Sequence, residues 1–61
     1  MEDYLYIIEY KYTSKSSIRY RSFSTISDAF EYYNFLKKNV SLEDLVLKKC
    51  SIKCEVLLCG R

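Results

Sequence analysis

Apolar and polar residues alternate along two neighbouring segments near the N-terminus. The run YLYIIEYKY is followed by the polar stretch TSKSS and then by IRYRSF. Alternation that is rich in Tyr and Ile, with a short polar interruption, is typical of a β-hairpin. We therefore predict strands over about residues 3–12 and 17–24, joined by the five residues TSKSS.

The loop length suggests how the two strands pair. A five-residue loop would place Tyr12 opposite Ile18 and Tyr10 opposite Tyr20. Because side chains alternate between the two faces of a strand, this register predicts one face that is mostly aromatic. That even-numbered face would carry Tyr4, Tyr6, Ile8, Tyr10, Tyr12, Ile18 and Tyr20.

The other face of the hairpin is expected to be mixed. Its apolar end would consist of Leu5, Ile7 and Phe23. Nearer the loop, the same register places Glu9 opposite Arg21, which predicts a cross-strand ion pair.

The periodicity changes from 2 to 3.6 in STISDAFEYYNFLKKN. The apolar stripe of this segment consists of Ile26, Ala29, Phe30, Tyr33 and Leu36. Thr25 followed by Asp28 resembles a capping box, and Asn39 is able to adopt the left-handed conformation of a helix C-cap. These signals predict a helix over about residues 26–38. Tyr32 and Phe35 lie off the stripe, which indicates either partial burial against the following loop or a second aromatic contact surface.

Alternation returns in LVLKKCSIKCEVLL, which predicts a strand over about residues 45–58. Lys48 and Leu57 interrupt the alternation, so we expect a bulge or a split into two strands near residues 51–53. A helix over residues 42–49 is the competing interpretation.

The three cysteines offer no obvious internal pairing. In a continuous strand, Cys50 and Cys54 would lie roughly 13 Å apart, beyond disulfide reach, and Cys59 would point the other way. We therefore expect reduced, structural thiols, with an intermolecular metal or redox role as the alternative. Since the chain has no histidine and no CxxC pair, we expect no metal site and no cofactor.

Together these segments predict an α+β domain that spans residues 1–61. It would contain an antiparallel sheet of three strands, or four if the last one splits, with one helix on one face. Because Phe23 immediately precedes the helix, we expect Leu5, Ile7 and Phe23 to face it. The Tyr-rich face would then be open. If the helix instead covers the Tyr-rich face, the spare apolar surface shrinks to Leu5, Ile7 and Phe23.

The composition favours a binding protein over an enzyme. The chain is 49% hydrophobic and 16% aromatic, more apolar surface than a domain of 61 residues is expected to bury. It has no histidine and one glycine, so it lacks the usual acid–base and phosphate-cradling motifs, and we expect no catalysis. The expected partner is another protein, a second copy of the chain, or both. The candidate interface residues are Tyr4, Tyr6, Ile8, Tyr10, Tyr12, Tyr20, Tyr32 and Phe35.

Nucleic-acid binding is the alternative hypothesis. Lys11, Lys15, Arg19 and Arg21 cluster near the hairpin tip and alternate with tyrosines, a combination that can grip phosphates and stack on bases. The predicted register weakens this hypothesis, because it directs the basic residues and the tyrosines to opposite faces. The net charge of +2 is also small for a protein that binds a polyanion.

The stretch IRYRSFSTISDAFEYYNFLKK resembles the strand, capping turn and amphipathic helix of very small phage-encoded β-β-α-β proteins, among them phage inhibitors of host RNA polymerase. The resemblance implies an inhibitor or adaptor that blocks a host protein, for example a defence protein. It also implies a location in the cytoplasm of a bacterial cell. The acidic start MEDY is unlike a signal peptide, and no stretch approaches the length of a membrane span, so we expect no membrane partner.

Overall fold

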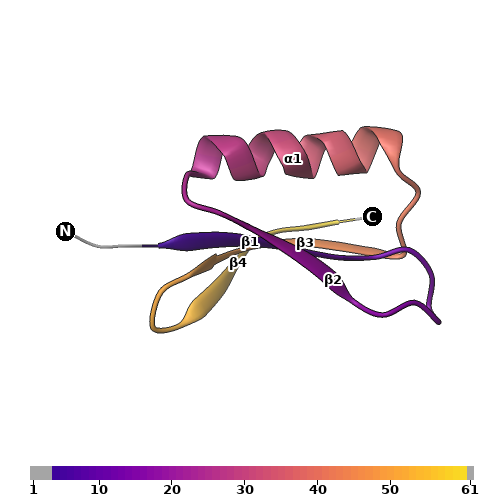
Figure 1. Ribbon diagram of the computed structural model, residues 1–61, viewed down its shortest axis with the longest axis horizontal. Helices are drawn as coiled ribbons and strands as arrows, with labels where there is room; N and C mark the ends of the chain where they lie inside the picture. The colour runs from indigo at the N-terminus through magenta and orange to yellow at the C-terminus, as the bar shows by residue number, and fades with distance from the viewer. Residues whose placement is uncertain (1–3, 61) are drawn as a thin grey trace.

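One helix lies across one face of a four-stranded antiparallel sheet, as Figure 1 shows for the computed structural model. The structure describes residues 4–60. In chain order the elements are β1 (Leu5–Lys11), β2 (Arg19–Phe23), α1 (Ile26–Asn39), β3 (Asp44–Cys50) and β4 (Cys54–Gly60). The strands are arranged in the order β2-β1-β3-β4, so β1 and β3 are central and β2 and β4 form the edges. The predicted α+β class is confirmed, with the fourth strand present.

The helix begins where its capping signal predicts. The Asp28 backbone N–H donates a hydrogen bond to Thr25 Oγ1 at 3.4 Å, and Thr25 itself is extended. The end of the helix differs from the expectation for Asn39, since no described residue has a positive φ. Val40 caps the helix in an extended conformation, which suits a β-branched residue. The Asn39 side chain instead donates to the Phe35 carbonyl oxygen at 3.1 Å.

The predicted register of the first hairpin is wrong by one residue. Tyr10 lies opposite Arg19, and Ile8 lies opposite Arg21. The cause is a tight turn centred between Ser14 and Lys15. In this turn the Ser16 N–H donates to the Thr13 carbonyl oxygen at 3.1 Å, and the two hydroxyls lie 2.9 Å apart. Pairing outward from this turn moves every β2 side chain to the face opposite the expected one.

The helix covers the Tyr-rich face of β1, against the preferred prediction. The core consists of Ile8, Leu45 and Leu47 from the sheet and Ala29, Tyr33 and Leu36 from α1. Phe23 packs against this core as predicted, because the shifted register places it on the covered face. Leu5 and Ile7 were wrongly assigned to that face. By strand alternation they lie on the side without the helix, and Leu5 is 51% exposed.

The C-terminal segment splits at residues 51–53 into a second hairpin, as one of the two alternatives predicted. A shift in pairing follows Leu47, so that Leu47 lies opposite Leu58 while Lys48 lies opposite Val56. Leu57 is the extra residue of this bulge. The competing helix over residues 42–49 is wrong, because β3 pairs with both β1 and β4 along this stretch.

Gly60 ends β4 opposite Leu45 and is held in the sheet. A side-chain carbon at position 60 would lie only 3.2 Å from the Tyr33 hydroxyl oxygen. Glycine therefore gives the buried Tyr33 ring room over the sheet. Within the described residues, no helix has both the length and the apolar character needed to cross a membrane.

Candidate interaction surfaces

The side of the sheet away from α1, here called the open face, carries several exposed apolar side chains. Strand alternation assigns Leu5 of β1, Tyr20 of β2 and Val56 of β4 to it, and their exposed fractions are 51%, 66% and 58%. Ile18, just before β2, is 62% exposed and shares a small hollow with Val46 on the same side. The open face is thus a surface of about half-exposed apolar groups that no helix or strand within residues 4–60 covers.

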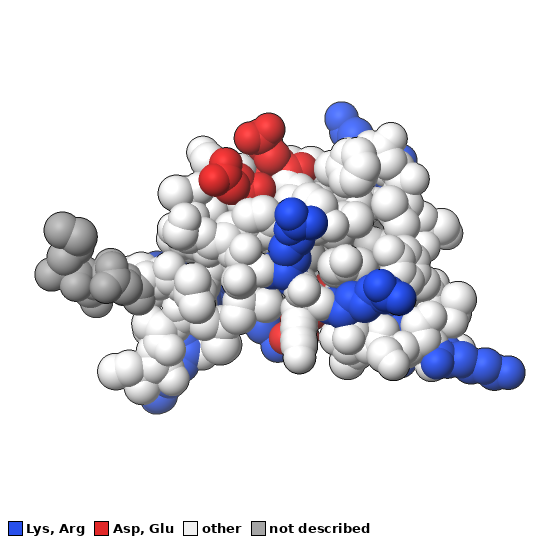
Figure 2. Space-filling view, in the orientation of Figure 1, with Lys and Arg blue, Asp and Glu red and all other residues white. Residues whose placement is uncertain are grey.

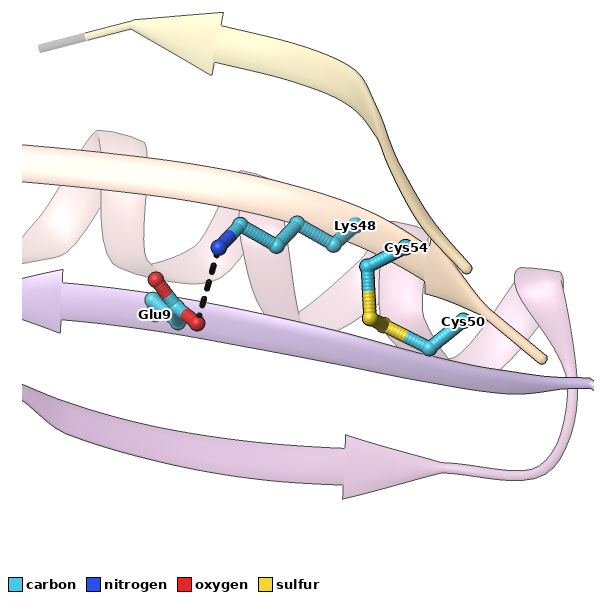
Figure 3. Close-up of a disulfide and its surroundings, with 4 residues drawn as sticks. All are labelled: Glu9, Lys48, Cys50 and Cys54. Atoms are coloured by element: carbon cyan, nitrogen blue, oxygen red, sulfur yellow. Dashed lines mark hydrogen bonds and ion pairs between the residues drawn. A yellow bond between two sulfur atoms is a disulfide. The ribbon is translucent and has the colours of Figure 1, made fainter. Parts of the chain in front are cut away.

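An ion pair lies in the middle of the open face. Lys48 Nζ and Glu9 Oε2 are 3.0 Å apart, with side chains 29% and 34% exposed. Figure 3 shows both side chains on the near side of the sheet, with the helix behind. A pair of this exposure contributes at most about 1 kcal/mol to folding. The predicted Glu9–Arg21 pair is wrong, because the observed register places Arg21 opposite Ile8, on the covered face.

The cysteines contradict the prediction of three reduced thiols. Cys50 and Cys54 form a disulfide, with their Cα atoms 4.0 Å apart. The separation expected from a continuous strand does not apply, since the chain reverses between them and they lie opposite each other. Cys59 is a free, exposed thiol. Among residues 4–60 no group of three or more potential metal ligands comes together.

The predicted tyrosine interface is largely occupied by the helix. Ile8 is fully buried, and Tyr6, Tyr10 and Tyr32 are half-buried against the core. Tyr4 is also half-buried, with the Lys49 ammonium 4.1 Å from the centre of its ring. The predicted interface residues that stay well exposed are Tyr12 at 41%, Tyr20 at 66% and Phe35 at 53%. They do not form one surface. Tyr12 lies on the side of the sheet that α1 covers, Phe35 belongs to α1 itself, and Tyr20 lies on the open face.

Two of the predicted basic residues join aromatic side chains on the helix side of β2. The Arg19 guanidinium lies 5.3 Å from the centre of the Tyr12 ring. That of Arg21 lies 5.9 Å from the Phe23 ring and 5.0 Å from the Tyr32 ring. We call these five residues the arginine–aromatic cluster. The prediction that the arginines point away from Tyr10 and Tyr12 is wrong, for the same reason as the register, whereas Tyr20 does lie on the face opposite the arginines.

The other two predicted basic residues lie elsewhere. Lys11 belongs to the open face, opposite Asp44. Lys15 is exposed in the hairpin turn, where its backbone N–H donates to Thr13 Oγ1 at 3.3 Å. The four basic residues therefore do not form a single patch. The signal that would have revealed this is the Thr-x-x-Ser spacing of the turn, since it sets the register.

Two tyrosines have raised pKa values. Hydrogen bonding with Tyr32 is the largest cause for Tyr10, followed by burial, and together they raise the pKa of its hydroxyl above 10.0. Burial, with a smaller contribution from Cys59, raises the pKa of Tyr33. Both hydroxyls therefore stay neutral at physiological pH, where they act as hydrogen-bonding and packing groups.

No protein-family model matches this chain, and neither do curated proteins or solved structures at a significant level.

Proposed function

We propose that this chain is a small, non-catalytic protein-binding module, an inhibitor or adaptor of another protein, that works as a homodimer. The observation that carries the proposal is the uneven covering of the sheet. Helix α1 packs on one face, whereas the open face keeps Leu5, Tyr20 and Val56 more than half exposed. Several exposed apolar groups on one face of a small domain are typical of a protein-binding surface.

A second copy is the occupant that fits the open face. Glu9 and Lys48 present one negative and one positive charge at its centre. A two-fold axis near this pair brings each charge toward the opposite charge of the other copy, with the apolar side chains packed around them.

The open face is also nearly large enough for a specific interface. Four strands of up to seven residues make a face of about 19 by 23 Å, and the uneven surface of the side chains adds contact area to it. Such an area approaches the lower end of specific interfaces, about 600 Å² per partner.

The inhibitor or adaptor role is supported by the small size of the chain and by its resemblance to phage-encoded inhibitors. Action inside a bacterial cell, on a host protein, is part of the same proposal. In that reducing compartment the Cys50–Cys54 disulfide would be opened to two thiols. The open face serves self-association in this arrangement, which leaves the edges of the sheet for the target.

The mass in solution tests the dimer. Light scattering over a wide concentration range should give twice the chain mass for the wild type. Val56→Glu should give the single-chain mass, because two carboxylates would be buried between the copies. The matched control is Phe30→Glu, which places a carboxylate at a similarly exposed apolar position (46%) on α1 and should remain dimeric. A wild type that stays monomeric at millimolar concentration would overturn the homodimer, as would an unchanged mass in Val56→Glu.

A further inference from the structure

The outer edge of β2 has the features of a docking site for an extended chain. β2 is an end strand of the sheet, so no described strand lies beside its outer backbone groups. A shallow hollow of about 570 Å³ runs along it, lined by Ile7, Tyr10 and residues 18–22. The other edge strand, β4, is interrupted by the bulge at Leu57, whereas β2 pairs with β1 without a shift. A straight strand therefore fits beside β2 better than beside β4.

The two sides of this edge differ in chemistry. Arg19 and Arg21 project on the helix side, and Tyr20 alternates with them on the open side, where Ile18 lies next to it. An added strand alternates in the same way, with every second side chain on each side. The edge therefore selects a sequence in which one kind of side chain meets arginine and the other meets Ile18 and Tyr20.

The two arginines are available to an anion. Within residues 4–60 neither guanidinium lies within ion-pair distance of a carboxylate, and the ion pair in that range joins Lys48 to Glu9. The rings of Tyr12, Phe23 and Tyr32 hold the guanidinium groups in place from one side. Their N–H edges keep the fork geometry that binds a carboxylate through two hydrogen bonds.

We propose that the outer edge of β2 binds an extended segment of the target protein as a fifth strand, with acidic side chains facing Arg19 and Arg21 and apolar side chains facing Ile18 and Tyr20. The assignment rests on the proposed protein-binding function and names the chemistry of the partner. A homodimer formed through the open face leaves the outer backbone groups of β2 and the helix-side arginines free on each copy. Because β2 is an edge strand, Ile18 and Tyr20 then lie at the rim of the dimer surface, next to the added strand.

An acidic peptide fits this edge better than a nucleic acid does. Asp28 and Glu31 line a neighbouring hollow together with Phe23, Tyr32 and Phe35, beside the rings on which Arg21 lies. Figure 2 shows acidic atoms gathered next to basic ones on this side of the molecule. A continuous phosphate backbone would meet both signs of charge, whereas a strand with a carboxylate at every second residue meets the arginines. The arginines also occupy ring faces that bases would need for stacking.

Fluorescence anisotropy with a labelled peptide of alternating Glu and Val tests the site on the full chain. The wild type should bind this peptide, and the analogue with Lys in place of Glu should bind at least tenfold more weakly. Methylating the backbone nitrogens on one edge of the peptide should also weaken binding at least tenfold, because strand addition needs those N–H groups. Absence of binding at millimolar peptide would overturn the site, and so would equal binding of the methylated peptide.

Matched charge variants locate the site. Arg19→Gln combined with Arg21→Gln should weaken peptide binding at least tenfold. Lys37→Gln combined with Lys38→Gln removes the same charge from the exposed end of α1 and should change binding less than twofold. Equal losses of peptide binding in both variants would show that only the net charge matters, and would overturn the site. An oligothymidine that binds more tightly than the peptide would also overturn it. If the arginine double variant does not fold, Arg19→Gln alone gives the same reading.

The peptide result and the dimer result are separable. Val56→Glu should bind the acidic peptide as the wild type does while being monomeric. Failure of peptide binding in a dimeric wild type overturns the edge site alone. Peptide binding by a monomeric wild type overturns the homodimer alone.

Discussion

The two faces of this sheet are built from the same strands, one residue out of step, yet they end in opposite environments. On the covered face Ile8, Leu45 and Leu47 are fully buried beneath α1. On the open face their sequence neighbours Val46 and Lys48 remain partly exposed. The comparison teaches that hydrophobicity does not decide burial residue by residue. Tyr33 is 3% exposed whereas Val56 is 58% exposed, because a single helix can cover only one side.

The position of the helix follows from the covered face itself. Ala29 is fully buried, and its small side chain lets α1 lie close to the sheet. Ile8 and Leu47 are paired across β1 and β3, so the central strands present adjacent aliphatic groups on that side. The corresponding centre of the open face is the Glu9–Lys48 ion pair, which resists burial in a monomer.

Shortening neighbouring side chains of β3 should lower the free energy of unfolding far more on the covered face than on the open face. This is the largest effect expected. Leu47→Ala should lower the free energy of unfolding by roughly 2–5 kcal/mol, because it leaves a cavity in the core. Val46→Ala, one residue away on the open face, should cost about 1 kcal/mol or less. Urea unfolding followed by circular dichroism measures both. Similar losses for the two variants would show that the faces are not distinct.

The disulfide joins two residues on the open-face side of β3 and β4 and stabilises the fold without burying more apolar surface. Closing the short loop between Cys50 and Cys54 should contribute roughly 2 kcal/mol, through the entropy of the unfolded chain. Reduction with a phosphine should therefore lower the urea midpoint of the wild type. The variant with Cys50→Ala and Cys54→Ala should not respond to reduction. An unchanged midpoint in a wild type shown by mass spectrometry to be fully reduced would contradict the contribution.

Alkaline pH should change the stability of the covered face by a smaller amount, through the hydroxyl of Tyr33. Burial on the covered face raises the pKa of Tyr33 above 10.0. The folded state therefore holds this proton more tightly than the unfolded state does. The stabilisation is complete below pH 10 and is lost as the pH rises through the folded-state pKa. The stability gap between wild type and Tyr33→Phe should be constant up to about pH 9 and should move against the wild type at higher pH. A gap that stays constant to pH 11.5 would contradict the raised pKa.

Local signals predicted the secondary structure well. The Thr25–Asp28 cap and the predicted apolar stripe located the helix to within one residue at its end. Of that stripe Ala29, Tyr33 and Leu36 are buried, whereas Ile26 and Phe30 are 43% and 46% exposed, because they lie off the side of α1 that faces the sheet. The interruption near residues 51–53 indicated the split that creates β4. These features depend on residues close together in the chain, so the sequence carries them directly.

The candidate surfaces were predicted less well, because they depend on pairing between strands. A loop counted as five residues contains a four-residue turn, and this one-residue difference moved Arg19 and Arg21 to the aromatic side of β2. The disulfide was missed for a similar reason, because Cys50 and Cys54 come together only when the chain reverses at residues 51–53.

The sequence by itself determined the order of strands and helix along the chain, the N-terminal cap of the helix and the α+β class, since each follows from local periodicity and hydrogen bonding. Only the tertiary structure decided which face α1 covers and which side chains share the edge of β2. In a two-residue period every face assignment turns on a single residue of register. That residue is set by the turn between Thr13 and Ser16, and the face that α1 buries is set by the packing of distant strands.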